Sequence, residues 1–402
     1  MTKQKPQNIL VAVLCVVLMG TMVMSGCAEA EAEPLPEPVV IVAPKVVAEP
    51  EPEPEPEPPP ITLPLSGIEV TDENDPLLHT RPLSVKIENT PESRPALGIT
   101  RADVVYETLT EGGITRFNAL FHSDIPEEIG SVRSARNSDI TIVPEYDAIF
   151  VFSGTNSLVW ADLGNTWINY MEEGTSGRAL YRIGHKAAPH NLYLKTELAF
   201  ERAEERGYQL YTPWPKGLMY GENDVSKLGD ENDAIEIFVP FSGSLFDVTW
   251  TYDPEAGNYL RFIRGQAQCD EADSSLQIAA ENVILLSVPY RNAPDVPGKG
   301  QTYNLDMTGS GDAIVFRDGV RIDCTWQTDG THPPLFTDKD GNPVLVKPGK
   351  TWFQVPRDIY SVVVTTGHLE LDDPGAVEAV SEETDEEAMQ AAIDADVDES
   401  NE

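Results

Sequence analysis

The sequence predicts an α/β (α+β) domain with a mixed sheet, then a smaller, mostly β domain, with a disordered acidic linker before them and a disordered acidic tail after them. Three observations lead to this prediction. In the first half of the folded region, strand-like runs alternate with helical stretches, the pattern of an α/β layer fold. In the second half, short apolar runs are separated by turn signals such as Asp318-Gly319. The linker is dominated by Pro and Glu, and the tail lacks the apolar area that would offset its ordering entropy.

Residues 1–27 are predicted to be a lipoprotein signal peptide. Lys3 and Lys5 precede an uncharged run, 9–24, that is shorter than the roughly 18–20 apolar residues of a membrane-spanning helix. The run ends in Met24-Ser25-Gly26-Cys27, which looks like a lipobox, where the Cys is lipidated and becomes the mature N-terminus. The alternative is an ordinary signal peptide or an anchor helix with an incidental Cys. Lipidation of Cys27 would place the protein on the extracytoplasmic face of the cell membrane, where several acyl chains hold it stably.

Residues 28–60 are expected to form an extended spacer. Eleven of them are Pro and nine are Glu, and Pro removes backbone donors and fixes φ, so neither a helix nor a sheet can form. At about 3.1 Å per residue, such a spacer reaches up to roughly 100 Å. Residues 369–402 contain 14 acidic residues and no Lys or Arg. We expect this tail to be disordered and assign it no partner.

The negative charge of the chain is concentrated in these two segments. The 402 residues carry a formal net charge of −39, to which the spacer contributes −8 and the tail −14. With +2 from the N-terminal lysines, −19 remains for residues 61–368. This balance argues against nucleic acid as a partner, because phosphate contacts need a clustered cationic surface. It does not exclude a small anionic ligand at one local site.

Residues 61–211 are expected to form the α/β domain. Its predicted strands are 83–88, 104–109, 115–122 and 148–153, and its predicted helices are 129–143, 157–171 and 196–206. The last helix has Leu198, Ala199 and Arg202 at helical spacing and is closed by Gly207.

A segment rich in Pro, Gly and charge, 212–232, precedes the β-rich domain at 232–368. The predicted strands there are 234–241, 248–252, 259–264, 283–288, 313–317, 320–326 and 344–346. Cys269 and Cys324 lie in or beside these strands, and outside the cell they could form a disulfide. The sequence leaves this pairing open, because the geometric window for a disulfide is narrow.

The residues that can carry chemistry concentrate in three stretches of the first domain. Residues 106–117 predict a strand, a double-Gly turn and a second strand, and the alternation places Glu107 and Leu109 on one face and Thr108 on the other. Arg133 and Arg136 are three residues apart, so on a helix they would share a face. The third stretch contains Arg182, His185, Lys186, His190 and Asn191.

Several motifs together resemble the YerB-like lipoproteins, a family built on the domain of unknown function 3048. One of these motifs is the signal with its lipobox. Those of the first domain are residues 81–83, 102–107, 111–116, 132–136 and 188–193. Residues 259–261, 282–283 and 348–352 resemble the family's smaller C-terminal domain. The resemblance covers most of 63–357 and implies a two-part extracytoplasmic lipoprotein with no established reaction. In one departure, Gln268 stands where the family tends to carry a His, so a His-dependent role there is not expected.

The Arg and His residues of the first domain are candidates for an anion-binding pocket. Arg binds carboxylate or phosphate bidentately, and His titrates near neutrality. The predicted ligand-binding residues are Arg116, Arg133, Arg136, His185, His190 and Asn191. The alternative is structural, with Arg–Glu pairs such as Arg116 with Glu107 holding loops onto the sheet.

The expected function is therefore binding of a cell-wall component, an anionic small molecule or another envelope partner. A second hypothesis is an envelope hydrolase acting on a glycan or a phosphodiester, with Glu107, Glu111 and His190 as candidate acid and base. A third is a scaffold that only positions other proteins. The sequence identifies neither the ligand nor the oligomeric state.

We expect neither a cofactor nor a metal site. His185 and His190 are five residues apart with Pro189 between them, which does not place them on one helix face, and a zinc site needs three or four ligands. A glycan-stacking face is conceivable from Trp160, Trp167, Trp250, Trp326 and Trp352, although burial is the usual role of Trp.

Overall fold

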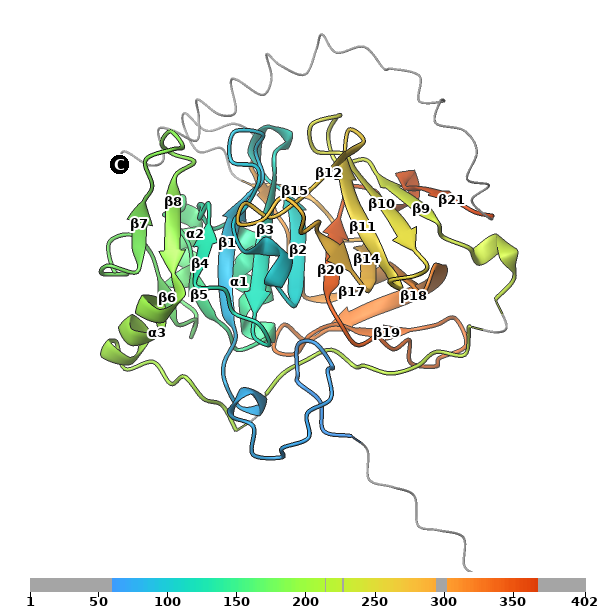
Figure 1. Cartoon of the computed structure of the whole chain (residues 1–402), viewed down its shortest axis with the longest axis horizontal. Helices are drawn as coiled ribbons and strands as arrows, with labels where there is room; N and C mark the ends of the chain where they lie inside the picture. The colour runs from blue at the N-terminus through green and yellow to red at the C-terminus, as the bar shows by residue number, and fades with distance from the viewer. Residues whose placement is uncertain (1–59, 214, 226–227, 294–301, 368–402) are drawn as a thin grey trace, which may run out of the picture. The chain divides into compact units, whose positions relative to one another are not determined.

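The computed structural model describes residues 60–213, 215–225, 228–293 and 302–367. The predicted signal peptide, Cys27, nearly all of the spacer and the acidic tail lie outside these residues. Within them the α-helices are α1 (Asn137–Glu145), α2 (Ser157–Leu163) and α3 (Thr196–Glu205), and most other regular structure is β (Figure 1). The predicted fold class is confirmed: helices are few, the sheet of the first half is large and mixed, and the second half is mostly β.

The main sheet has ten strands, drawn from both halves of the chain. In spatial order these are β19 (Leu335–Thr337), β18 (Val320–Thr328), β17 (Gly309–Arg317), β14 (Asn282–Leu286), β20 (Thr351–Val355), β2 (Val104–Leu109), β3 (Thr115–Phe121), β1 (Leu83–Glu88), β5 (Ile149–Val151) and β6 (Tyr170–Met171). Strand β20 joins the two halves, because it pairs in parallel with β14 on one side and with β2 on the other. The division into two domains stays a prediction.

Two smaller sheets pack near the main one. The first contains β4 (Glu128–Gly130), β8 (Leu192–Lys195) and β7 (Leu180–Arg182). The second contains β12 (Gln266–Ala267), β11 (Asn258–Ile263), β10 (Val248–Asp253), β9 (Glu236–Val239) and β21 (Val363–Thr365), with β13 (Ala279–Ala280) paired to β11. A separate short pair is formed by β15 (Arg291–Asn292) and β16 (Tyr303–Asn304).

The main sheet is buried on both faces, and the strand alternation sorts its side chains into two cores. Val105 and Leu109 of β2 belong to one core, which also takes in Trp250 of β10. Val104 and Tyr106 of the same strand belong to the other core, which also takes in residues of α1 and α2. The predicted alternation of β2 is thus confirmed, and Glu107 shares its face with Val105 and Leu109.

The structure corrects three predicted elements. The helix predicted at 129–143 begins only at Asn137, because Ser131–Arg133 run beside β1 and hydrogen-bond to it: Glu88 N donates to Ser131 O (3.0 Å) and Arg133 N to Lys86 O (2.9 Å). The helix predicted at 157–171 ends at Leu163. No strand forms at 344–346, where Val346 makes an isolated bridge with Tyr220, while the nearby β20 was not predicted.

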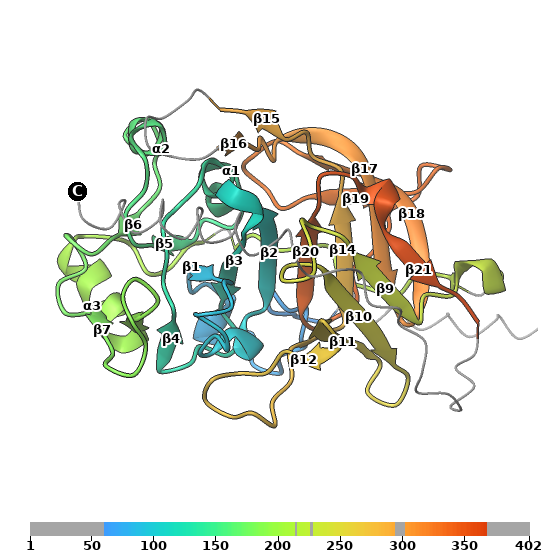
Figure 2. The same ribbon diagram turned by 90° about the horizontal axis from the view of Figure 1, so that it is seen from above.

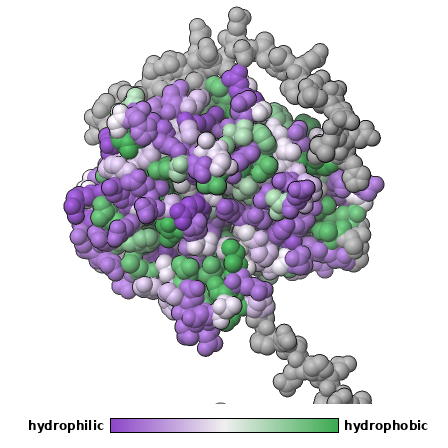
Figure 3. Space-filling model, in the orientation of Figure 1, coloured by the Kyte–Doolittle hydropathy of each residue, from purple (hydrophilic) through white to green (hydrophobic). Residues whose placement is uncertain are grey.

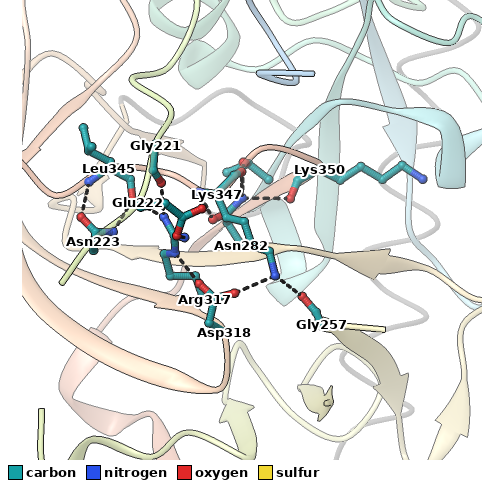
Figure 4. A network of polar contacts seen from close by, with 11 residues as sticks. Gly221, Glu222, Asn223, Gly257, Asn282, Arg317, Asp318, Leu345, Lys347 and Lys350 are labelled. Atoms are coloured by element: carbon teal, nitrogen blue, oxygen red, sulfur yellow. Dashed lines mark hydrogen bonds and ion pairs between the residues drawn. The ribbon is translucent and has the colours of Figure 1, made fainter. Parts of the chain in front are cut away.

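A polar network fixes the turn that leads into β20 (Figure 4). The Asn282 side chain accepts from Lys347 N (2.8 Å) and donates to Lys347 O (2.8 Å), so it holds that residue from both sides. Asp318, in the turn after β17, pairs with Lys347 (2.6 Å) and with Arg317 (2.7 Å). These contacts explain the 348–352 motif as a structural turn that positions the strand joining the two halves.

Candidate functional site

A buried cluster of charged side chains lies on the β1–β3–β2 face covered by α1. We call it the basic cluster. Its cations come from β1, β3, the 131–136 segment and the 183–191 loop, and its carboxylates come from β1, the β2–β3 turn and α1. Its members are Lys86, Arg116, Arg133, Arg136 and His190 with Glu88, Glu111 and Asp139.

Glu88 is the centre of one half of the cluster. Its Oε1 lies 3.1 Å from Arg133 Nε and 3.0 Å from His190 Nδ1, and it accepts a hydrogen bond from Thr90 Oγ1 (3.1 Å). Burial by itself would raise the pKa of Glu88, but Arg133 and His190 hold it below its ordinary value. Glu88 is therefore a buried carboxylate whose Oε1 contacts both the Arg133 guanidinium and the His190 imidazole.

Lys86 and Asp139 form the other half. Lys86 Nζ lies 2.8 Å from Asp139 Oδ1, and both side chains are fully buried. Asn118 donates to the same oxygen (2.9 Å), and Asp139 Oδ2 accepts from Arg136 N (2.6 Å), which caps α1. Burial lowers the pKa of Lys86 although Asp139 opposes this, and Arg116 and Arg136 lower it further. Lys86, Arg116 and Arg136 therefore lie close enough for their positive charges to affect one another.

The outer edge of the cluster is formed by Arg136 and Glu111. Arg136 Nε lies 2.8 Å from Glu111 Oε2, and the two side chains are 8% and 15% exposed. Deeper in, Arg116 donates to Ser134 O (3.2 Å). The members of the cluster named above are four Lys or Arg side chains, three carboxylates and His190.

Of the predicted ligand-binding residues, the structure brings Arg116, Arg133, Arg136 and His190 together. The two arginines of the 131–136 segment do not share a helix face as predicted, since α1 begins only at Asn137 and Arg136 is its N-cap. They converge because the segment runs beside β1 and then enters α1. Their role in binding stays a prediction.

His185 and Asn191 make different contacts. His185 is two-thirds exposed, and its Nε2 lies 2.9 Å from Glu271 Oε1, next to a 2.8 Å pair of Lys186 with the same carboxylate. Asn191 accepts from Arg182 (2.9 Å) and donates to Ile183 O (3.1 Å). These contacts attach the 183–191 loop to the rest of the molecule.

Glu107 points to the opposite face of the sheet. In the register of β2 and β3 it stands beside Phe117, whereas Arg116 stands beside Thr108. The expected pair of Arg116 with Glu107 is therefore wrong. Glu107 instead binds Arg261 of β11, with both carboxylate oxygens 3.1 Å from Nη2. Because the sheet separates Glu107 from His190, these two residues do not form a common acid–base site.

The two cysteines of the second half are free. Cys324 lies on β18 and packs in the core shared with α1, and burial raises its thiol pKa to about 12. Cys269 follows β12 of the other sheet and pairs in an isolated bridge with Gln277. The disulfide considered from sequence is not formed, because the two residues belong to different sheets. The Gln268 side chain donates to the nearby Gln266 O (3.2 Å).

In the described part of the chain, no three His, Cys, Asp or Glu side chains come together so that they could hold a metal ion. No helix in those residues combines the length and apolar character needed to cross a bilayer.

The sequence reasoning missed Lys86, Glu88 and Asp139. The signal that could have identified the first two is the alternation in β1, where Ser84, Lys86 and Glu88 share one face and Leu83, Val85 and Ile87 share the other. Charged side chains in such a strand are normally expected to face solvent. Here α1 and the 131–136 segment cover them.

Comparisons with known proteins agree with the resemblance noted in the sequence. Residues 65–209 match the model described as "Protein of unknown function (DUF3048) N-terminal domain", and residues 237–353 match its C-terminal counterpart. The chain is 29% identical over 306 residues to "Putative lipoprotein YerB" of Bacillus subtilis (strain 168), covering 76% of this chain and 88% of that protein. A crystal structure of YerB protein from the same organism superposes with a TM-score of 0.67 at 27% identity, covering 76% of this chain and 99% of the other.

Proposed function

We propose that the chain, which belongs to the family defined by the DUF3048 N-terminal and C-terminal domains, is a membrane-anchored extracytoplasmic lipoprotein. We also propose that it binds an anionic ligand of the cell envelope at the basic cluster. The relative's printed name, a lipoprotein, supports the anchor. So does the sequence Met24-Ser25-Gly26-Cys27, which places a Cys directly after small residues at the end of an apolar run.

Metabolic labelling with a palmitate analogue tests the anchor. The natural chain is expected to take up the label and to fractionate with membranes, and Cys27→Ser is expected to lose both properties. Cys15→Ser is the matched control, because Cys15 lies inside the apolar run and is removed with the signal. Labelling that survives Cys27→Ser would refute lipidation at this residue.

One observation supports the binding proposal: four Lys or Arg side chains converge in one buried cluster of a protein whose net charge is −39. A local concentration of cations in an acidic protein attracts a small anion, and guanidinium groups can bind it through paired hydrogen bonds. Thr108 Oγ1 supports the same site. It is buried on the face of Arg116 and has no hydrogen-bond partner among the described residues, so it is free to bind a ligand oxygen.

Ligand entry would occur at the Arg136–Glu111 pair. This pair is the part of the cluster with the most exposed carboxylate, and Glu111 lies in the short turn Glu111–Gly113 between β2 and β3. An incoming anion can take the place of the Glu111 carboxylate on Arg136, since both present oxygens to the same guanidinium. The buried pairs of Glu88 and Asp139 would hold the remaining cations in position.

Inorganic phosphate is a suitable probe for this site. The test uses the mature chain with Cys27→Ser, which removes the lipid. Phosphate is expected to raise the melting temperature of this protein until the site is saturated. The same phosphate concentrations should raise the melting temperature of the Arg136→Gln variant much less. Arg321→Gln is the control, because Arg321 forms an exposed pair with Asp323 at 2.8 Å. An unchanged melting temperature, or equal shifts in both variants, would contradict the proposed site.

A further inference from the structure

One stretch of the surface exposes two tryptophans. Trp167 is 99% exposed, Trp160 is 36% exposed, and Leu158 beside them is 37% exposed. We call these three residues the α2 surface. The other tryptophans considered for a stacking face, Trp250, Trp326 and Trp352, are all buried in the cores. Figure 3 shows one face of the molecule, on which apolar patches lie among hydrophilic residues. Among the large apolar side chains of the described residues, Trp167 has the largest exposed fraction.

Within the α2 surface, Trp160 is packed from behind by two aromatic rings. The Trp160 ring lies 5.7 Å from the Phe152 ring and 6.1 Å from the Tyr170 ring, and those two rings lie 5.6 Å from each other. Asn156 begins α2 by accepting from Leu158 N (3.1 Å) and Val159 N (3.0 Å). Trp160 is therefore a fixed platform, while Trp167 extends from the loop after the helix.

The position of this surface leaves it accessible. Helix α2 connects β5 with β6, and β6 is the last strand of the main sheet. Figure 2 shows α2 at the periphery of the molecule, far from β18 and β21. The basic cluster uses none of the three residues, so the two sites can act independently.

The charge around the α2 surface indicates which partner it suits. Residues 157–169 contain no Lys or Arg, Asp162 is exposed within them, and Glu173 farther along the chain is paired with Arg182 at 2.9 Å. Anionic lipids and phosphate-bearing polymers therefore find no cationic side chain on this segment, and both bind through such side chains. Exposed polar groups such as Asn165 also surround the indoles, whereas protein-binding hot spots are centred in an apolar patch.

We propose that the α2 surface binds a neutral glycan strand. The apolar C–H face of a pyranose ring stacks on an indole, and two indoles that belong to one short segment can engage neighbouring sugars. The carboxylate of Asp162 and the amide of Asn165 would accept and donate hydrogen bonds with the sugar hydroxyl groups. The spacer predicted at residues 28–60 would let an anchored protein reach such a strand. This inference does not depend on the basic cluster.

A soluble, uncharged oligomer of N-acetylglucosamine is the probe, titrated into the mature Cys27→Ser chain by calorimetry. We expect saturable binding, a loss of at least tenfold in affinity for Trp167→Ala, and partial retention for Trp167→Phe. Because Trp167 is 99% exposed, its replacement should leave the melting temperature unchanged. Tyr360→Ala is the matched control, since Tyr360 is an exposed aromatic residue (70%) on a different segment.

Three results would overturn the proposal. The first is an absence of saturable binding to the oligomer. The second is equal affinity of the Trp167→Ala variant and the parent chain. The third is that Trp167→Ala alters only partition into phosphatidylcholine vesicles or only self-association in sedimentation, which would assign the surface to a membrane or to a second copy of the chain.

Discussion

Arg261 of β11 and Glu107 of β2 join the two large sheets through a fully buried ion pair. Arg261 Nη2 lies 3.1 Å from each Glu107 carboxylate oxygen, and Thr115 donates to the same carboxylate (2.8 Å). The guanidinium lies 5.4 Å from the centre of the Phe117 ring and 5.3 Å from that of Trp352. The pair therefore sits in an aromatic cage with little solvent, where each charge depends on the other.

Removing one partner of this pair should be strongly destabilising. Arg261→Met leaves the Glu107 carboxylate buried without its counter-charge, so we expect the free energy of unfolding in urea to fall by about 3–5 kcal/mol. The double variant Arg261→Met with Glu107→Gln should recover much of that loss. The exposed pair Arg321–Asp323 serves as the comparison, and Arg321→Met there should cost about 0–1 kcal/mol. Equal losses at both pairs would contradict this account.

Glu145 at the end of α1 predicts a dependence of stability on pH. Burial raises its pKa from 4.5 to about 8, although Thr328 donates to its carboxylate (3.1 Å). The folded protein then binds a proton that the unfolded chain has released, so stability should fall as pH rises from about 4.5 to about 8. Glu145→Gln removes this titration. The variant's melting temperature should therefore decrease less over that range, and exposed Glu205→Gln should behave like the parent chain.

The elements predicted well are those whose patterns are local. Strands β1 and β2 have the predicted bounds, because alternation and flanking turns are sufficient to define them. Strand β20 was missed because Thr351–Val355 is short and buried on both faces, so it shows no alternation of apolar and polar residues. Residues 131–136 were predicted as helix because their spacing is compatible with one, and only the pairing with β1 determines otherwise.

The candidate site was predictable only in part, for a related reason. Arg133, Arg136 and His190 could be found because they stand in recognisable motifs. Glu88, the carboxylate partner of Arg133 and His190, could not be found, since its pairing depends on which strand face α1 covers. The pairing of Glu107 with Arg261 depends on contact between two sheets, over 154 residues of sequence.

Thiol chemistry should distinguish the two cysteines. Cys269 is partly exposed, whereas Cys324 is buried with its thiol pKa raised to about 12, and only the thiolate reacts rapidly. In the native Cys27→Ser mature chain, Ellman's reagent should therefore titrate one thiol, and unfolding in urea should expose the second. A count of zero in unfolded, unreduced protein would indicate a disulfide and contradict the structure.

Gly349 should be intolerant of any side chain. Its φ is +131°, and a Cβ at this position would lie 2.4 Å from Glu281 Oε2, the atom that accepts from Lys350 N (2.6 Å). Gly349→Ala must therefore strain the backbone and displace the carboxylate that holds the turn into β20. We expect a loss of roughly 1–3 kcal/mol in the free energy of unfolding, measured in urea.

A second glycine separates the two causes of that loss. Gly309 at the start of β17 also has a positive φ, +100°, but no atom lies within 4 Å of a Cβ built there. Gly309→Ala would therefore measure the cost of backbone conformation without a steric clash. If Gly349→Ala costs clearly more, the difference reflects the displaced Glu281 carboxylate. Equal costs would mean that the Glu281 carboxylate moves freely and does not hold the turn.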